Sequence, residues 1–456
     1  MNRRSFLTDA SRFAAGGLFN RYSLGASLST ALALSSLPSA NAADYKSLVV
    51  VFLKGGFDGN DMLVPLDAGY KDYSAARPNL ALKRDELIPI AGYGQGSLGM
   101  HPGMQSLLPL YQQGRLAWVA NIGALVRPLT AAQWRNNEVA VPPFLMSHSE
   151  QVNIVQGWDP SDIVNGWGGR AMELLPSELV RSLPVVSYAF DNTLVTGLRS
   201  RMTLANSNGT RWWGRADLGD SNNRWTQLVE SLGHFQSRNP IENEFASSLS
   251  ASFNDAMALS VAEQKAAKNR TLFPNHRLGS DLSHIASLMP VFKSEGVRRQ
   301  LFFTDFGNFD THLTQRGTEE GVALDIQVQQ TAQALAAFDA ELRLRNLDRD
   351  VVVVVMSEFG RTLQPAGQGT DHAWGNHWFV MGAPIRGGQV YGRIPSLVLG
   401  GVDDGDTWKK GRWVPDYASD QLAASLMQWL GLSGDRFTRV FPNLANFKDK
   451  TLPIFS

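Results

Sequence analysis

The chain has 456 residues, no cysteine, and equal numbers of basic and acidic side chains, 42 of each. The absence of cysteine excludes disulfides, thiolate zinc sites and iron–sulfur clusters, so any metal must be held by His, Asp, Glu and other oxygen ligands. The balanced charge gives no indication of nucleic-acid binding or of a polybasic membrane contact.

Residues 1–42 are typical of an export signal. Arg3-Arg4 is followed by a mildly apolar stretch, Leu24–Leu37, and by Ala40-Asn41-Ala42, a small-residue cleavage site. We therefore predict twin-arginine (Tat) export, with the Tat translocase as a transient partner, to the periplasm or the medium. No later apolar run reaches the roughly 18 residues that a spanning helix needs, so no stable membrane anchor is expected.

Apolar runs predict a mostly parallel sheet. Tyr45–Leu53 and Val351–Val355 are apolar on both faces, which is typical of strands covered on both sides. Strand–helix–strand order predicts parallel pairing. Further strands are expected at 114–123, 183–190, 297–304 and 388–391, and helices at 101–111, 241–268, 321–345 and 419–430. We predict one α/β domain over 43–456, with a cap inserted at about 194–284.

The first strand is followed by a glycine-rich turn that carries Asp58 and Asp61. Glycines let the backbone turn sharply and approach a ligand closely, so either carboxylate is a candidate metal ligand. The alternative is that these side chains cap the turn.

The stretch around Ser147 predicts a helix start. Ser147 with Glu150 three residues later matches a capping box. A hydroxyl at a helix N-terminus also lies where backbone N–H groups stabilise anions, which suits a nucleophile. Both interpretations stay open.

Two later strand ends carry residues that bind metals. Asp310 and His312 are two apart, so in an extended loop both side chains project to the same side. The valine strand ends in Glu358, and the glycine-rich loop after it delivers His372 and His377. Because parallel strands share one carboxyl edge, these groups can converge. They would suit one or two divalent ions that polarise an oxyanion, although turn caps would also explain Asp310 and His312.

In this order the motifs resemble those of the alkaline phosphatase and sulfatase-like superfamily. Within it, LKGGFDGND, SHSEQ, FDTH and SEFGRT followed by GTDHAWGNHW are similar to a twin-arginine-exported family, domain of unknown function 1501. The resemblance spans most of the mature chain. It implies a three-layer α/β/α sandwich around a mostly parallel sheet.

The resemblance also implies roles for single residues. Ser147 would be the nucleophile, and Arg361 or Arg170 would clamp anionic oxygens. Phe359 stands where the superfamily typically has a metal histidine, so a two-metal site would be reduced to one ion unless His148 or His377 substitutes. The implied metal ligands are Asp58 or Asp61, Asp310, His312, Glu358 and His372.

These observations predict an exported hydrolase of phosphate or sulfate esters that depends on Zn, Mn, Ca or Mg. Its partner would be a small anionic ester or a glycan, and not a nucleic acid. The alternative is a non-catalytic periplasmic binding or assembly protein that keeps the fold with degraded chemistry. Phe359 and tryptophans such as Trp212 and Trp213 favour that alternative. Close approach of the predicted ligands to one point would favour the hydrolase.

Overall fold

The structure is a computed structural model, which describes residues 44–91, 96–157, 165–180, 183–199, 202–207, 220 and 222–455. The predicted export signal lies outside the described residues, as do Trp212 and Trp213. Within the described ranges, no helix is long and apolar enough to cross a membrane.

Nine strands of the described chain form the main sheet, in the order β13–β5–β12–β9–β1–β8–β6–β7 with β14 beside β5. All of them run in one direction except β12, which pairs antiparallel with both neighbours. Their bounds are β1 (Lys46–Leu53), β5 (Leu116–Gly123), β6 (Val185–Ser187), β7 (Thr203–Leu204), β8 (Arg299–Phe306), β9 (Val351–Met356), β12 (Asn376–Met381), β13 (Gln389–Tyr391) and β14 (Tyr417–Ala418).

The centre of this sheet is apolar on both faces. Val49 of β1 lies between Phe302 of β8 and Val353 of β9, and all three are buried. Each valine buried in this way contributes about 1.5–3 kcal/mol. The packed centre therefore gives the strand ends fixed positions.

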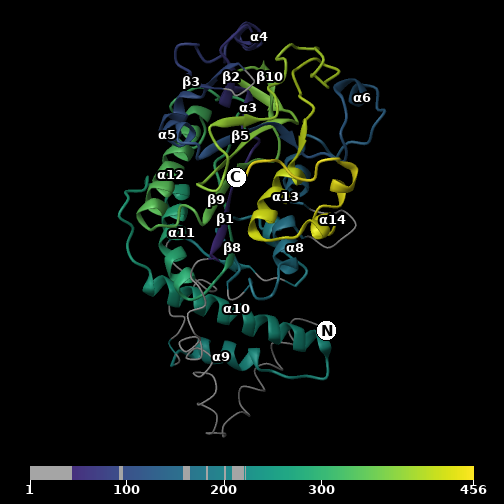
Figure 1. Cartoon of the computed structure of the whole chain (residues 1–456). Coiled ribbons are helices and arrows are strands. Elements are labelled where there is room, and N and C mark those ends of the chain that lie inside the picture. The colour runs from purple at the N-terminus through teal and green to yellow at the C-terminus, as the bar shows by residue number, and fades with distance from the viewer. Residues whose placement is uncertain are drawn as a thin grey trace. The chain divides into compact units, whose positions relative to one another are not determined.

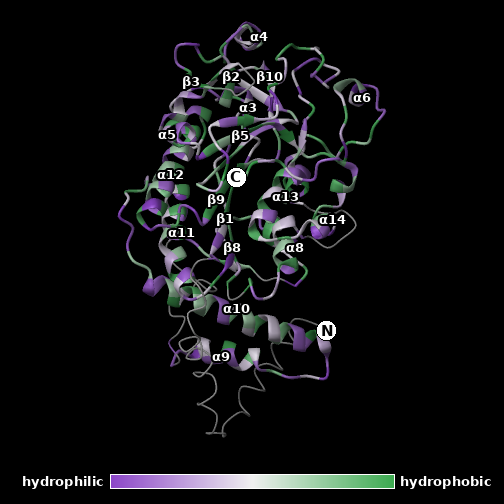
Figure 2. Ribbon diagram, in the orientation of Figure 1, coloured by the Kyte–Doolittle hydropathy of each residue, from purple (hydrophilic) through white to green (hydrophobic). Residues whose placement is uncertain are grey.

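Helices cover both faces of the sheet (Figure 1). One layer contains α5 (Leu108–Gln112), α11 (Arg277–Ser294) and α12 (Leu324–Leu344), and the other contains α8 (Trp167–Leu174), α13 (Ser419–Leu430) and α14 (Phe437–Val440). Hydrophilic and hydrophobic residues alternate around α11 and α12, as expected for helices with one face on the core (Figure 2). The fold is the predicted α/β/α sandwich with a mostly parallel sheet.

The remaining elements are shorter or peripheral. The predicted cap region includes α9 (Arg224–Gly233) and α10 (Pro240–Lys265), which pack around Val229, Leu249 and Phe253. Two small antiparallel sheets comprise β2 (Leu63–Pro65), β4 (Ser97–Met100) and β3 (Ile88–Ala91), and β10 (Arg361–Ala366) with β11 (Gly369–His372). The other helices are α3 (Gly59–Met62), η3 (Pro102–Leu107), α4 (Gly69–Ala76), α6 (Ala131–Arg135), α7 (His148–Val155), η4 (Thr193–Val195), η5 (Gly434–Arg436) and η6 (Pro442–Asn446).

Candidate metal centre

Residues from three separate parts of the chain meet beyond the carboxyl ends of β8 and β9. The loop after β8 carries Asp310 and His312, β11 ends at His372, and α7 begins at His148. The β10–β11 hairpin places His372 opposite Arg361.

A glycine after β1 allows the loops to pack this closely. Gly55 has φ +106°, and a Cβ there would lie 2.4 Å from the backbone nitrogen of Asp310. Any other residue would push the Asp310 loop away, so the Lys54-Gly55-Gly56 turn contributes space rather than a ligand.

Four side-chain atoms form the candidate centre: Nε2 of His148, His312 and His372, and Oδ1 of Asp310. The Nε2 atom of His372 is 3.0 Å from that of His148 and 3.0 Å from that of His312. Asp310 Oδ1 lies 2.9 Å from His312, 3.1 Å from His372 and 3.4 Å from His148. The four side chains are 22–40% exposed, so solvent reaches them.

Hydrogen bonds to residues outside the cluster decide which ring nitrogen of His372 and of His148 points toward the centre. His372 Nδ1 is 2.8 Å from the Met146 carbonyl, and His148 Nδ1 is 2.9 Å from Glu358 Oε1. Both oxygens accept hydrogen bonds, so in the neutral rings Nδ1 carries the proton. The Nε2 lone pairs then face each other, an arrangement that only a shared proton or a cation stabilises.

The charges at the centre are strongly coupled. Burial opposes protonation of His148, but hydrogen bonds to Asp310 and Glu358 raise its pKa to about 9. Burial alone would raise the pKa of Asp310, yet hydrogen bonds from His148, His372 and Arg361 hold it well below its usual range. Burial and the positive charge of Arg361 lower the pKa of His312. A proton on His148 Nε2 therefore takes the place that a cation would fill.

The donor set fits a divalent metal. Tetrahedral bonds of about 2.0–2.1 Å place ligand atoms about 3.3 Å apart, close to the 2.9–3.4 Å between Asp310 Oδ1 and each Nε2 atom and to the 3.0 Å between His372 Nε2 and the other two. Imidazoles with a carboxylate suit zinc and similar borderline ions. The donors fall into two overlapping groups that could each hold an ion: His148, Asp310 and His372, and His312, Asp371 and His372.

Glu358 and Arg361, predicted as a ligand and an anion clamp, instead support the centre from outside. Besides contacting His148, Glu358 accepts a hydrogen bond from the Gly55 N–H. Arg361 is fully buried and donates to Asp310 Oδ1 at 2.7 Å. Outer partners of this kind orient ligands and tune the metal.

Phe359 contacts the centre without contributing a ligand. Its ring centroid lies 4.8 Å from that of His148 and 5.0 Å from that of His372. At the place where the resemblance implied a missing histidine, Phe359 packs the two rings, and His148 supplies an Nε2 atom.

Asp58 and Asp61 do not join the cluster. Arg77 Nη1 lies 2.6 Å from Asp58 and 2.7 Å from Asp61, and all three side chains are fully buried. Gln315 donates to both carboxylates, and Arg316 pairs with Asp61. Burial would raise the pKa of Asp61, but Arg316 and Arg77 hold it well below the usual range. Since guanidinium groups already neutralise these carboxylates, we leave them out of the proposed ligand set.

Two further predicted residues lie elsewhere. His377 is buried and its Nδ1 accepts from the backbone N–H of Asn121 at 2.9 Å. Arg170 donates to the carbonyls of Gly157 and Val440 at 2.6 and 2.7 Å. Neither belongs to the four-atom cluster.

Ser147 lies at the margin of the centre, because it stands in the chain between His148 and Met146, whose carbonyl contacts His372. The predicted capping box is wrong, because the Ser147 side chain caps no backbone N–H of α7. Its hydroxyl instead donates to the carboxylate of Glu150. Phe144 and Met146 have φ of 52° and 70°, a rare conformation for residues other than glycine that is often found at functional sites.

Sequence reasoning treated His148 only as a substitute ligand, and missed the Met146 carbonyl and Arg77 altogether. His148 lies inside the SHSEQ motif, which was the available signal. A backbone carbonyl has no sequence signature, and Arg77 is separated from Asp58 by the helix α4.

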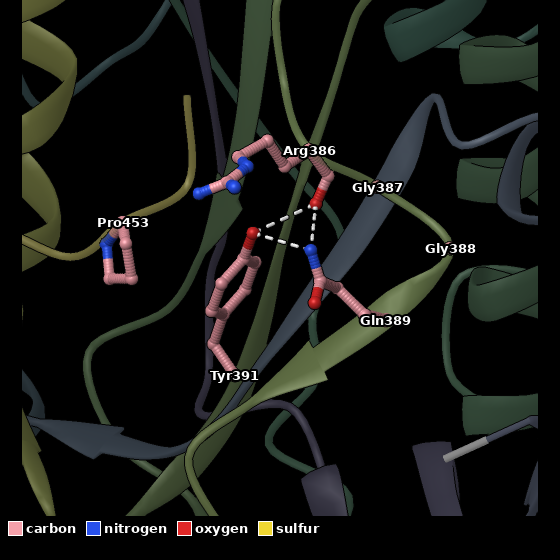
Figure 3. A pocket seen from close by; sticks show the side chains of 6 residues that line it. All are labelled: Arg386, Gly387, Gly388, Gln389, Tyr391 and Pro453. Carbon is pink, nitrogen blue, oxygen red and sulfur yellow. Dashed lines mark hydrogen bonds between the residues drawn. The ribbon is translucent and has the colours of Figure 1, made fainter. Parts of the chain in front are cut away.

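A surface hollow of about 460 Å³ near β13 offers no comparable chemistry (Figure 3). Tyr391 donates to the Arg386 carbonyl at 2.9 Å, and Gln389 donates to Tyr391 at 2.7 Å. Its polar groups thus bond to one another, and none of the cluster residues lines it.

The fold and the cluster together define an α/β/α protein with a candidate His/Asp metal centre. The chain belongs to the family described as "Protein of unknown function (DUF1501)", whose model matches residues 45–405. A search of curated proteins found no match.

Solved structures with similarity to the chain include a lipoteichoic acid synthase and a sulfatase. The lipoteichoic acid synthase LtaP from Listeria monocytogenes shares 10% identity over 86% of this chain and 74% of that one, with a TM-score of 0.32. The PsFucS1 sulfatase from Pseudoalteromonas sp. shares 11% identity over 87% and 75%, with a TM-score of 0.31. At these scores we base no assignment of residues on either structure.

Proposed function

We propose that this protein is an exported hydrolase of phosphate or sulfate esters that depends on a divalent metal. One observation carries the proposal: the Nε2 atoms of three imidazoles each lie within 3.4 Å of Asp310 Oδ1. His148, Asp310, His312 and His372 would hold the ion. A bound divalent ion supplies a Lewis acid that stabilises developing charge on an ester oxygen.

The chain's own residues would perform the remaining steps. Ser147 Oγ is the proposed nucleophile, and Glu150, which accepts its hydrogen bond, would take the proton. Glu358 and the Met146 carbonyl hold the two Nδ1 protons, so that both Nε2 atoms stay directed to the centre. Arg361 fixes Asp310.

Metal analysis of the purified mature chain tests the centre. Wild-type protein should bind about one zinc or manganese ion per chain, and Asp310→Asn and His312→Asn should bind much less. His234→Asn, an exposed histidine at the end of α9, is the matched control and should leave metal content unchanged. A broad ester panel then compares the wild type with Ser147→Ala. Metal-free protein that hydrolyses nothing would sink the proposal.

Export is tested separately. Replacing Arg3-Arg4 by two lysines should leave the protein in the cytoplasm, whereas the unaltered chain should appear in the periplasm or medium. Equal distribution of both forms would contradict Tat export without affecting the metal proposal.

A further inference from the structure

Two arginines contact the proposed centre, and the first is buried and paired with a carboxylate. Arg361 is fully buried, and its Nη1 donates to Asp310 at 2.7 Å and to the Gly55 carbonyl at 3.3 Å. Its Nε donates to the Thr370 hydroxyl at 3.3 Å, and its Nη2 donates to the Thr370 carbonyl. Each nitrogen therefore already has an acceptor.

The second arginine is occupied in the same way. Arg412 donates from Nε to the His372 carbonyl at 2.8 Å, from Nη2 to Asp371 at 3.0 Å and from Nη1 to Asp406 at 3.0 Å. Its side chain is 14% exposed. One guanidinium thus pairs with two carboxylates.

A third cation, Lys54, is next to the glycine turn and is also paired. Its Nζ lies 3.5 Å from Asp305, a carboxylate that Arg277 contacts as well. Dianionic phosphate groups are usually held by guanidinium groups that offer two free N–H donors. The charges of Arg361 and Arg412 are already paired with the protein's own carboxylates. Moving either guanidinium onto a substrate would leave a carboxylate unpaired, which is costly at a partly buried position.

The charge balance points in the same direction. Asp310 and Glu358 each carry one negative charge and Arg361 one positive charge, so a divalent ion would give the centre one net positive charge. A substrate with one negative charge would neutralise it. A second negative charge would exceed this balance.

Resting on the proposed function, we infer that this centre selects esters that carry a single negative charge, such as sulfate monoesters, over dianionic phosphate monoesters. The selection comes from the pairing of Arg361 and Arg412 with the protein's own carboxylates. Asp406 acts as a specificity residue through Arg412.

Phenyl sulfate and phenyl phosphate make a matched pair of probes, because they share the ring and differ by one charge at pH 8. Zinc-loaded Ser147→Ala protein is titrated with each by calorimetry, which reads binding rather than turnover. Phenyl sulfate should bind at least about tenfold more tightly. Equal or tighter binding of phenyl phosphate would overturn the inference, as would zinc-loaded protein that binds neither probe.

Releasing Arg412 should change the preference. Asp406→Asn, made in the same background, should improve phenyl phosphate binding about tenfold relative to phenyl sulfate. Asp403→Asn is the control, because Asp403 pairs with Arg393 in the same region, and it should leave the ratio unchanged. An unchanged ratio in Asp406→Asn would overturn the role of Arg412. Failure of the wild type to bind zinc would overturn the proposed function and this inference together, whereas zinc binding with the opposite preference overturns only the inference.

Discussion

His148 Nδ1 lies 2.9 Å from Glu358 Oε1, and this contact directs the opposite nitrogen of the ring toward Asp310. The relationship joins the start of α7 to the residue just beyond β9, two segments about 200 residues apart. A carboxylate behind a histidine fixes the ring's tautomer and raises its basicity, an arrangement common behind metal-ligating histidines. Glu358 therefore acts on the centre through His148.

Glu358→Gln should weaken zinc binding by about 10- to 100-fold while leaving the fold intact, because the amide can still accept a hydrogen bond but carries no charge. Competition with a chromogenic chelator measures the affinity, and circular dichroism checks the fold. Glu341→Gln is the matched control, since Glu341 is fully buried but pairs with Arg345. Equal zinc affinities for Glu358→Gln and the wild type would contradict the role given to Glu358.

Metal binding should release about one proton at pH 7.5. The pKa of His148 is raised to about 9, so in the metal-free protein this ring is protonated at pH 7.5 and must lose the proton to become a ligand. Apparent zinc affinity should therefore rise with pH up to about 9. Calorimetry in two buffers of different ionisation enthalpy measures the release, and His148→Asn should abolish it. Binding heats that do not depend on the buffer would contradict the shared-proton interpretation.

The apolar runs predicted most of the sheet because the central strands are buried on both faces. The antiparallel strand Asn376–Met381 was missed: it begins with Asn376 and His377, and it is recognisable only through its pairing with β5 and β9. The position of β12 between β5 and β9 depends on the topology of the whole sheet, which the residue pattern of one strand does not encode.

The candidate site was predictable to the extent that its residues follow strand ends. Asp310, His312 and His372 were named on that ground, and the structure brings them together. Asp58 also follows a strand end, but Arg77 from beyond α4 lies against it. Packing between distant segments decides that Asp58, and not Asp310, lies against Arg77. The spacing of residues in the sequence could therefore not distinguish the two carboxylates.

The Arg77 network should be a large stabilising element that is sensitive to removal of one partner. Arg77→Leu leaves Asp58 and Asp61 buried with less compensation, and we expect a loss of about 3–5 kcal/mol in the free energy of unfolding. Urea denaturation followed by fluorescence measures it. Lys83→Ala, which removes an exposed ion pair with Glu86, should cause no measurable change. If Arg77→Leu were as stable as the wild type, the network would not have the role described.

The contribution of His377 to stability should fall as the pH drops below 6.5. Burial lowers the pKa of this ring to about 4, whereas in the unfolded chain it titrates near its usual value of about 6.5. Between these values the unfolded state binds a proton that the folded state does not, so the His377 contribution to stability decreases by at most about 1.4 kcal/mol per pH unit. Asp281 and Asp420, whose pKa values burial raises to about 6, act in the opposite direction.

Comparison with His377→Gln isolates this contribution, because the aspartates are present in both proteins. Glutamine keeps an acceptor for the Asn121 N–H but does not titrate, so the wild type should lose stability relative to the variant as the pH falls from 6.5 to 4. Urea midpoints at pH 7.5, 6 and 5 measure the slope. His234→Gln, at an exposed position, should keep the wild-type slope. Identical slopes for His377→Gln and the wild type would show that His377 takes up its proton as readily in the folded chain as in the unfolded one.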